Sequence, residues 1–198
     1  MINLKCDAVL PECEMKPLED IENSITAEYK KSIWAKFLKA VNEYGLVQDG
    51  DKIAIAISGG KDSLLLYKLF QRLKKDKRRN FEFRAVNLNP GFKKEDLDNF
   101  KNNLLKLDID CEIFDTNIWK IANEKAKDYP CFLCAKMRRG ILYKKVEEYG
   151  YNKLALGHHF DDVIETTLIN IFYSGSVKTM TPVVDSTSGK LRFVIRLS

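Results

Sequence analysis

The sequence of 198 residues contains no run of the roughly 20 apolar residues that a membrane-spanning helix needs. Its first residues, MINLKCDAVLPECEMKP, mix lysine, aspartate and glutamate where a secretory signal peptide would have an apolar core. Internal repeats and low-complexity segments are also missing. With 45% hydrophobic residues, the chain has enough apolar material for one sizeable core. We therefore expect a cytoplasmic protein, with no membrane partner, built around a single domain.

Histidine is scarce and cysteine is not. The two histidines are adjacent, at His158 and His159, and the five cysteines are an odd number in a chain without an export signal. This pattern favours thiol chemistry or metal ligation over a disulfide framework. The excess of positive charge is also small, because 33 lysines and arginines face 28 aspartates and glutamates. A net charge of +5 suits a polyanionic partner without requiring one.

Strand and helix patterns alternate along most of the chain. Residues 52–57 are apolar on both faces, as in a central parallel strand, and helical spacing resumes at residues 64–73. Further strands are expected at residues 81–88, 111–114, 153–156 and 191–195, the last at a sheet edge, and further helices at residues 25–44, 94–107, 133–149 and 161–173. This alternation predicts an α/β fold with a doubly wound parallel sheet, whose ligands bind at the carboxyl ends of the strands.

The first 25 residues differ from the rest. They are acidic, poorly periodic and contain Pro11 and Pro17, which predicts a loop or an appended arm. The domain is therefore expected to span residues 26–198.

A glycine-rich turn, Ser58-Gly59-Gly60-Lys61-Asp62-Ser63, joins the first strand to the following helix. Backbone N–H groups and the dipole at a helix start favour an anion there. The turn is not a Walker A loop, because residue 55 is isoleucine instead of glycine and residue 62 is aspartate instead of serine or threonine. The alternative is an ordinary glycine-rich turn with Asp62 as a first-turn acid.

Two more motifs carry chemistry. In residues 154–166, LALGHHFDDVIET, a strand again passes through glycine into a helix, and its adjacent carboxylates could cap the helix or hold magnesium. Cys131 and Cys134 open a helix with Lys136, Arg138 and Arg139, an electropositive setting that lowers a thiol pKa. Taken alone, this C-x-x-C pair fits a redox pair, half a zinc site or part of an iron–sulfur site.

Together the three motifs resemble those of a known group of enzymes. The string SGGKDS after an apolar strand resembles the PP-loop of N-type ATP pyrophosphatases, which adenylate a substrate and release pyrophosphate. With GHHFDDVIETTLIN and PCFLCAKMRRG, the resemblance is closest to the tRNA 2-thiocytidine synthetases and covers about residues 30–196. It implies an adenine-nucleotide-binding PP-loop fold of the HUP-like type. The implied reaction is ATP-dependent replacement of the carbon 2 oxygen of an anticodon-loop cytidine by sulfur.

The resemblance also implies roles for individual residues. Catalytic roles fall to Cys131, Cys134, Asp161 and Lys61. Binding of the nucleotide falls to Ala56, Ile57, Ser58, Gly59, Gly60, Lys61, Asp62, Ser63, Leu88, Gly157, Asp161 and Asp162. Asp62 and Asp161 are the magnesium candidates, Glu165 is a further acid for metal or substrate activation, and the two cysteines would ligate a [4Fe-4S] cluster. The histidines are expected to form local hydrogen bonds.

The implied cofactors are ATP, Mg²⁺ and the cluster, and the implied partners are tRNA, a sulfur donor such as a cysteine desulfurase, and a second copy of the chain. Arg138, Arg139 and the charge run at residues 74–79 are candidates for contacts with RNA phosphates, the alternative for the run being a solvated helix end. Cys111 is expected in the core.

One departure from the family is clear. The family has a third cluster cysteine well beyond the C-x-x-C pair, and this chain has no cysteine after Cys134. We therefore expect a domain truncated at its C-terminus or one with altered chemistry. The alternatives are a lysidine-synthetase-like enzyme, a non-catalytic nucleotide- or RNA-binding fragment, and a zinc protein in which Cys6 and Cys13 complete a four-thiolate site.

Overall fold

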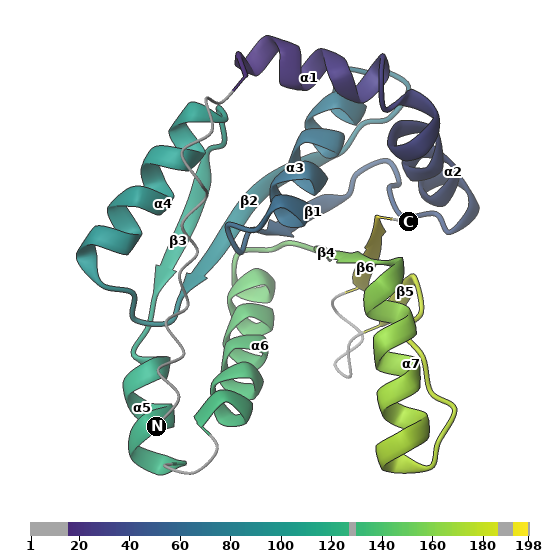
Figure 1. Ribbon diagram of the computed structural model, residues 1–198. Helices are drawn as coiled ribbons and strands as arrows, with labels where there is room; N and C mark the ends of the chain where they lie inside the picture. The colour runs from purple at the N-terminus through teal and green to yellow at the C-terminus, as the bar shows by residue number, and fades with distance from the viewer. Residues whose placement is uncertain (1–15, 127–129, 186–191, 198) are drawn as a thin grey trace.

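The computed structural model describes residues 16–126, 130–185 and, for the backbone, 192–197. Its centre is a six-stranded sheet in the order β3-β2-β1-β4-β6-β5 (Figure 1). Neighbouring strands are parallel except for β5 and β6, which are antiparallel. The strands are β1 (Lys52–Ala56), β2 (Glu82–Asn89), β3 (Cys111–Asp115), β4 (Lys153–His159), β5 (Val183–Asp185) and β6 (Arg192–Leu197).

Helices cover both faces of the sheet, so the predicted doubly wound α/β fold is confirmed. They are α1 (Leu18–Thr26), the π-helix η1 (Lys30–Trp34), α2 (Ala35–Glu43), α3 (Lys61–Lys74), α4 (Lys94–Lys106), α5 (Ile118–Lys125), α6 (Pro130–Glu148) and α7 (Phe160–Ser174). Helices α1 to α4 share one apolar core with Ile53 and Ile55 of β1. Helices α5 and α6 share the other with Ala54. Strand β1 is therefore apolar on both faces because each face is covered.

The strand order reverses direction between β1 and β4. From β1 the chain moves outward through β2 to β3, and then returns to β4 on the other side of β1. In sheets of this kind the loops at the carboxyl ends of the two central strands part at this point and leave space for a ligand. The glycine-rich turn follows β1 and α7 follows β4, so both motifs lie at this switch point.

The structure differs from the expected boundary between residues 25 and 26, which falls inside α1. Ile25 is only 5% exposed and belongs to the core, and Glu22 forms a 2.8 Å ion pair with Lys68 of α3. The spacing of Leu18, Ile21 and Ile25 gives this acidic stretch an apolar side. Residues 1–15 lie outside the described part of the chain.

The expected edge strand at residues 191–195 is an inner strand. As β6 it pairs with β4 on one side and with the three-residue β5 on the other, so β5 forms the edge. Such a short strand gives too little alternation to be recognised in a sequence. Within the described residues, none of the helices is both long and apolar enough to cross a membrane.

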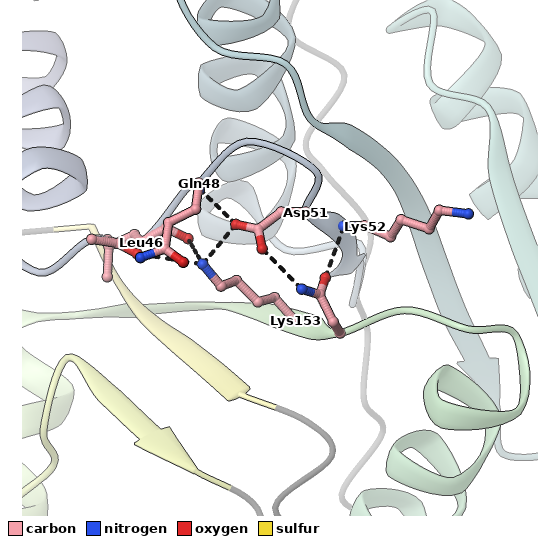
Figure 2. A network of polar contacts seen from close by, with 7 residues as sticks. Leu46, Gln48, Asp51, Lys52 and Lys153 are labelled. Carbon is pink, nitrogen blue, oxygen red and sulfur yellow. Dashed lines mark hydrogen bonds and ion pairs between the residues drawn. The ribbon is translucent and has the colours of Figure 1, made fainter.

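A buried ion pair locks β4 to β1 at the amino-terminal edge of the sheet (Figure 2). The Lys153 ammonium donates to Asp51 Oδ2 at 2.6 Å and to the carbonyls of Gly45 and Leu46. Asn152 donates to Asp51 Oδ1 at 2.9 Å and accepts from the Lys52 N–H at 2.8 Å. Because both charged side chains are about 95% buried, neither could be solvated if the other were removed.

We predict that Lys153→Met lowers the free energy of unfolding by about 3–5 kcal/mol, because Asp51 would be left buried without its counter-ion. The matched control is Lys52→Met, since Lys52 is 58% exposed and lies 4.0 Å from Glu82. The control should change stability by less than about 1 kcal/mol. Urea denaturation of both variants checks this, and equal small losses would contradict a structural role for the buried pair.

Candidate functional site

The glycine-rich turn presents an open helix start at the switch point. Gly60 precedes the first turn of α3 in an extended conformation, and no side chain of the described residues caps the helix. Gly59 has a φ of +90°, and a Cβ there would lie 3.3 Å from the ring of Phe100 on α4. Glycine is therefore required at residue 59. The uncapped N–H groups, with the exposed Lys61 beside them, form a site for an anion.

Two serines brace this turn from inside. Ser63 is 5% exposed, and its hydroxyl donates to the Gly60 carbonyl at 2.8 Å while accepting from the Ser58 N–H at 3.2 Å. The Gly60 N–H donates to the Ser58 hydroxyl at 3.3 Å. Of the residues predicted to surround a pyrophosphate, Ser58 is exposed and Ser63 is held inside the loop. Ser63 therefore shapes the anion site before any ligand enters.

Gly157 brings the second motif against this turn. A Cβ on Gly157 would lie 2.9 Å from the backbone nitrogen of Ser63 and 3.0 Å from its Cα. Real side chains do not approach a backbone so closely, so only glycine allows β4 to lie against the start of α3. Gly157 therefore has a packing role, and its nucleotide-binding role stays a prediction.

The two adjacent aspartates that follow have different surroundings. His159 is the N-cap of α7: its Nδ1 accepts from the Asp162 N–H at 3.4 Å, and Asp162 Oδ2 accepts from the His159 N–H at 2.7 Å. This reciprocal pair is a capping box with histidine in the place of serine or threonine. The side chain of Asp161 is 77% exposed. Asp162 therefore fixes the helix, while Asp161 and the exposed Glu165 one turn later are available to a metal or substrate.

The capping role of His159 was not predicted from the sequence, because histidine is not among the common N-cap residues. The detectable signal was the acid three residues later. The expectation that the histidines form local hydrogen bonds is confirmed for His159, and His158 Nδ1 lies 3.5 Å from Asp162 Oδ2.

The strand-end residues predicted to bind the nucleotide, Ala56, Ile57 and Leu88, mostly make contacts within the fold. The Ile57 N–H donates to Val86, and its carbonyl accepts from Asn87 Nδ2 at 2.6 Å. Leu88 is 5% exposed within the core shared with α6, and Ala56 packs against the same core. Sequence reasoning missed Asn87, which is 3% exposed and whose Oδ1 has no hydrogen-bond partner in the described part of the chain. A polar residue inside a buried strand was the available signal.

The two cysteines at the start of α6 also differ. Cys131 is exposed, whereas Cys134 is 7% exposed and packs in the apolar core beneath β1 and β4. They lie three residues apart, on neighbouring positions of one side of a helix, which suits two ligands of one metal group. Among the described residues no cluster of three or more histidine, cysteine, aspartate or glutamate side chains could hold a metal ion.

Of the other cysteines, only Cys111 lies in the described part of the chain, and it forms no metal-binding cluster with this pair. Cys111 is half-buried in β3 and packs against the core from its edge, so the expected position inside the core is only partly met; burial raises the pKa of its thiol to about 12. Cys6 and Cys13, proposed to complete a zinc site, lie outside the described residues.

Comparison with known proteins assigns the chain to a family. The model of the PP-loop domain matches residues 29–194. The chain belongs to the PP-loop domain family. The tRNA-cytidine(32) 2-sulfurtransferases of Francisella tularensis (strain WY96-3418) and Polynucleobacter necessarius (strain STIR1) are both 40% identical to it, over 172 and 163 residues. These matches cover 84% and 80% of this chain, but 63% and 53% of the relatives, so the chain spans between half and two thirds of their length. The resemblance drawn from the motifs is confirmed.

A solved structure shares the fold. The U34-tRNA thiolase NcsA from Methanococcus maripaludis, solved with its [4Fe-4S] cluster, matches with a TM-score of 0.60 and 23% identity. The match covers 92% of this chain and 60% of that one. At this identity it supports the arrangement of strands and helices.

The basic run at residues 74–79 lies far from the PP-loop. It begins at the last residue of α3, a helix of 14 residues and hence about 21 Å long, with the PP-loop at its opposite end. Lys74 donates to the Phe81 carbonyl, Arg78 pairs with Asp76, and Lys75 pairs with Glu22. The structure therefore favours the alternative of a solvated helix end, and only Arg138 and Arg139 of the predicted phosphate contacts lie on the same helix as the cysteines.

Helix α7 carries an apolar surface outside the core. It extends away from the end of β4 (Figure 1), and none of its residues is buried within the described structure. The exposed apolar side chains of α7 and the turn after it are Phe160, Ile164, Leu168, Ile169, Ile171, Phe172, Tyr173 and Val177. So many exposed apolar side chains on one helix are typical of a contact region.

We predict that Gly157→Ala weakens binding of ATP, the ligand implied by the resemblance to PP-loop enzymes, by about tenfold or more. The new methyl group must displace the first turn of α3, and a loss of about 1.4 kcal/mol in binding free energy corresponds to a tenfold weaker affinity. Gly140→Ala is the control, because a Cβ at residue 140 on α6 meets no atom within 4 Å. Calorimetric titration with ATP measures both, and unchanged affinity in Gly157→Ala would refute the close-packing argument.

The capping box gives a separate prediction about stability. Asp162→Ala should lower the free energy of unfolding by about 1 kcal/mol, the usual cost of losing a helix cap. Asp161→Ala should change it by less than about 0.5 kcal/mol, since an exposed side chain makes no cap. Thermal and urea unfolding distinguish the neighbours, and a larger loss for Asp161→Ala would reverse the assignment.

Proposed function

We propose that this PP-loop domain catalyses ATP-dependent thiolation of tRNA, in which a cytidine of the anticodon loop is adenylated and its carbon 2 oxygen is replaced by sulfur. The observation that carries the proposal is the contact of Gly157 with Ser63, which joins the PP-loop to the acidic motif. The 40% identity to tRNA-cytidine(32) 2-sulfurtransferases supports this choice of reaction. The proposed partners are tRNA, a sulfur donor such as a cysteine desulfurase and a second copy of the chain, and the proposed location is the cytoplasm.

The PP-loop would bind the phosphates of ATP. The uncapped N–H groups of α3 face the site, and Lys61 adds a positive charge that stabilises the departing pyrophosphate. The cytidine carbon 2 oxygen attacks the α-phosphorus of ATP, and the bond from this phosphorus to pyrophosphate breaks. Asp161, with Asp62, would hold magnesium, which neutralises phosphate charge when bound. The backbone near Ala56, Ile57 and Leu88 would border the adenosine.

The second half of the reaction needs a sulfur nucleophile. Sulfide adds to the activated carbon 2, the carbon–oxygen bond breaks, and AMP leaves with the oxygen, so no oxidant or reductant is consumed in this exchange. Cys131 and Cys134 would ligate a [4Fe-4S] cluster, which would carry the sulfide when bound. Two thiols three residues apart on one helix can supply two ligands of such a cluster, and the third cysteine of the family's ligand set has no counterpart in this sequence.

The decisive test uses the iron- and sulfide-reconstituted protein under anaerobic conditions. It is incubated with ATP, magnesium, a sulfur source and unmodified tRNA, and the nucleosides are analysed by mass spectrometry. We expect 2-thiocytidine, with one AMP and one pyrophosphate formed for each. Cys131→Ser should abolish thiolation, whereas Cys111→Ala, at a core thiol, should retain it. Asp161→Asn should slow pyrophosphate release by about 100-fold, the usual effect of losing one electrostatic contact in a transition state.

Other outcomes would assign a different role. Pyrophosphate release with an amino-acid adduct on the base, unaffected by Cys131→Ser, would identify a lysidine-synthetase-like enzyme. ATP binding without pyrophosphate release in the presence of tRNA would identify a non-catalytic nucleotide-binding domain. Stoichiometric zinc without iron–sulfur absorption would point to a structural metal site.

A further inference from the structure

The amino-terminal part of α6 is rich in positive charge and has no acid. From Pro130 to Lys145 its charged residues are Lys136, Arg138, Arg139, Lys144 and Lys145. The last two pair with Glu148 at the end of the helix. Within the described residues, the other three form no ion pair. Since paired cations attract a further anion weakly, the unpaired three are the ones available to an outside partner.

Two of these cations share one helix face with an exposed aromatic ring. Phe132, Lys136 and Arg139 are spaced by four and three residues, which places them in one row along α6. We call this row the α6 face. All three side chains are exposed, and Phe132 is 75% exposed. The row reaches Tyr143, whose hydroxyl pKa is raised because burial outweighs the opposing effect of the charge on Arg139.

The α6 face lies beside the exposed cysteine. Phe132 follows Cys131 directly, at the tip of the helix where the C-x-x-C pair begins. It is two residues from the buried Cys134, which is about 200° around the helix and therefore on the opposite side. The core contacts of Cys134 thus turn the α6 face outward, next to Cys131, which is proposed to ligate the cluster that carries the sulfide.

An aromatic ring between cations matches the chemistry of an RNA loop. Loops present phosphates together with unpaired bases that stack on aromatic side chains. We propose that the α6 face binds the loop of the RNA substrate, with Lys136 and Arg139 on phosphates and Phe132 stacked on an unpaired base. This rests on the proposed function in one respect, that the substrate is a tRNA, and it names the surface that receives the loop.

The experiment measures binding of a fluorescent anticodon stem-loop RNA to the full chain over a series of KCl concentrations. Phe132→Ala should weaken binding by about tenfold without changing the salt dependence, and Phe132→Trp should restore it. Lys136→Gln and Arg139→Gln should each reduce the slope of log affinity against log salt by about 0.7–0.9. A fully paired RNA of equal length should bind equally well to Phe132→Ala and to the unmodified chain, because it offers no unpaired base.

Two matched controls test whether position matters. Tyr44→Ala removes an exposed ring at the end of α2, beyond the amino-terminal edge of the sheet, and Lys144→Gln removes a cation of the same helix that is paired with Glu148. Both should bind the stem-loop within about twofold of the unmodified chain, since neither belongs to the α6 face. Losses equal to those of the α6-face variants would show that only bulk charge and exposed rings matter, and would overturn the proposal.

Three further results would overturn it. These are unchanged stem-loop affinity in Phe132→Ala, an equal loss for paired and looped RNA in Phe132→Ala, or variants that bind RNA normally but accept sulfur poorly from a cysteine desulfurase. The last would make the α6 face a protein-docking surface. Because binding requires no turnover, the proposed reaction can fail separately: the expected affinities without any 2-thiocytidine would support the α6 face and refute the thiolation.

Discussion

The contact on which the site depends is between two backbones, where β4 lies against the first turn of α3. Gly157 and Ser63 are far apart in the sequence, and the space between them excludes even a methyl group. This contact joins the PP-loop to the strand that leads into α7. At the other edge of the sheet, the buried pair of Lys153 and Asp51 fixes β4 to the start of β1, the strand that leads into the PP-loop. The position of the site is therefore set by strand packing at both ends of β1 and β4.

Much of this arrangement could be predicted from local patterns. A strand that is apolar on both faces must be covered on both, and a glycine-rich turn after it opens a helix at the carboxyl edge. What could not be predicted depended on distant contacts. The acidic stretch before residue 26 was predicted to be a loop or an arm, but Ile25 packs in the core and Glu22 forms an ion pair with Lys68. Likewise, β6 was predicted to be an edge strand, but the short β5 pairs with it and forms the edge.

The availability of the basic residues could likewise not be predicted from local sequence. The run at residues 74–79 and the cations of α6 are similar in sequence, since each concentrates lysine and arginine in a few residues. They differ in their partners: the run is held by Asp76, Glu22 and a backbone carbonyl, whereas the three cations in the first half of α6 form no ion pair within the described residues. Composition gives the number of charges, but only the fold decides which of them remain available to a polyanion.

Each of the three motifs contains two residues of one type, of which one is held within the fold and the other is exposed. Ser63 is buried in the PP-loop while Ser58 is exposed, Asp162 caps α7 while Asp161 is exposed, and Cys134 lies in the core while Cys131 is exposed. A reactive group at a helix start needs a fixed backbone, because a displacement of about 1 Å can cost two orders of magnitude in rate. An exposed side chain that formed these contacts within the fold would no longer be free to contact a ligand. A buried neighbour of similar chemistry fixes the backbone instead, so the exposed residue of each pair is the one available for chemistry.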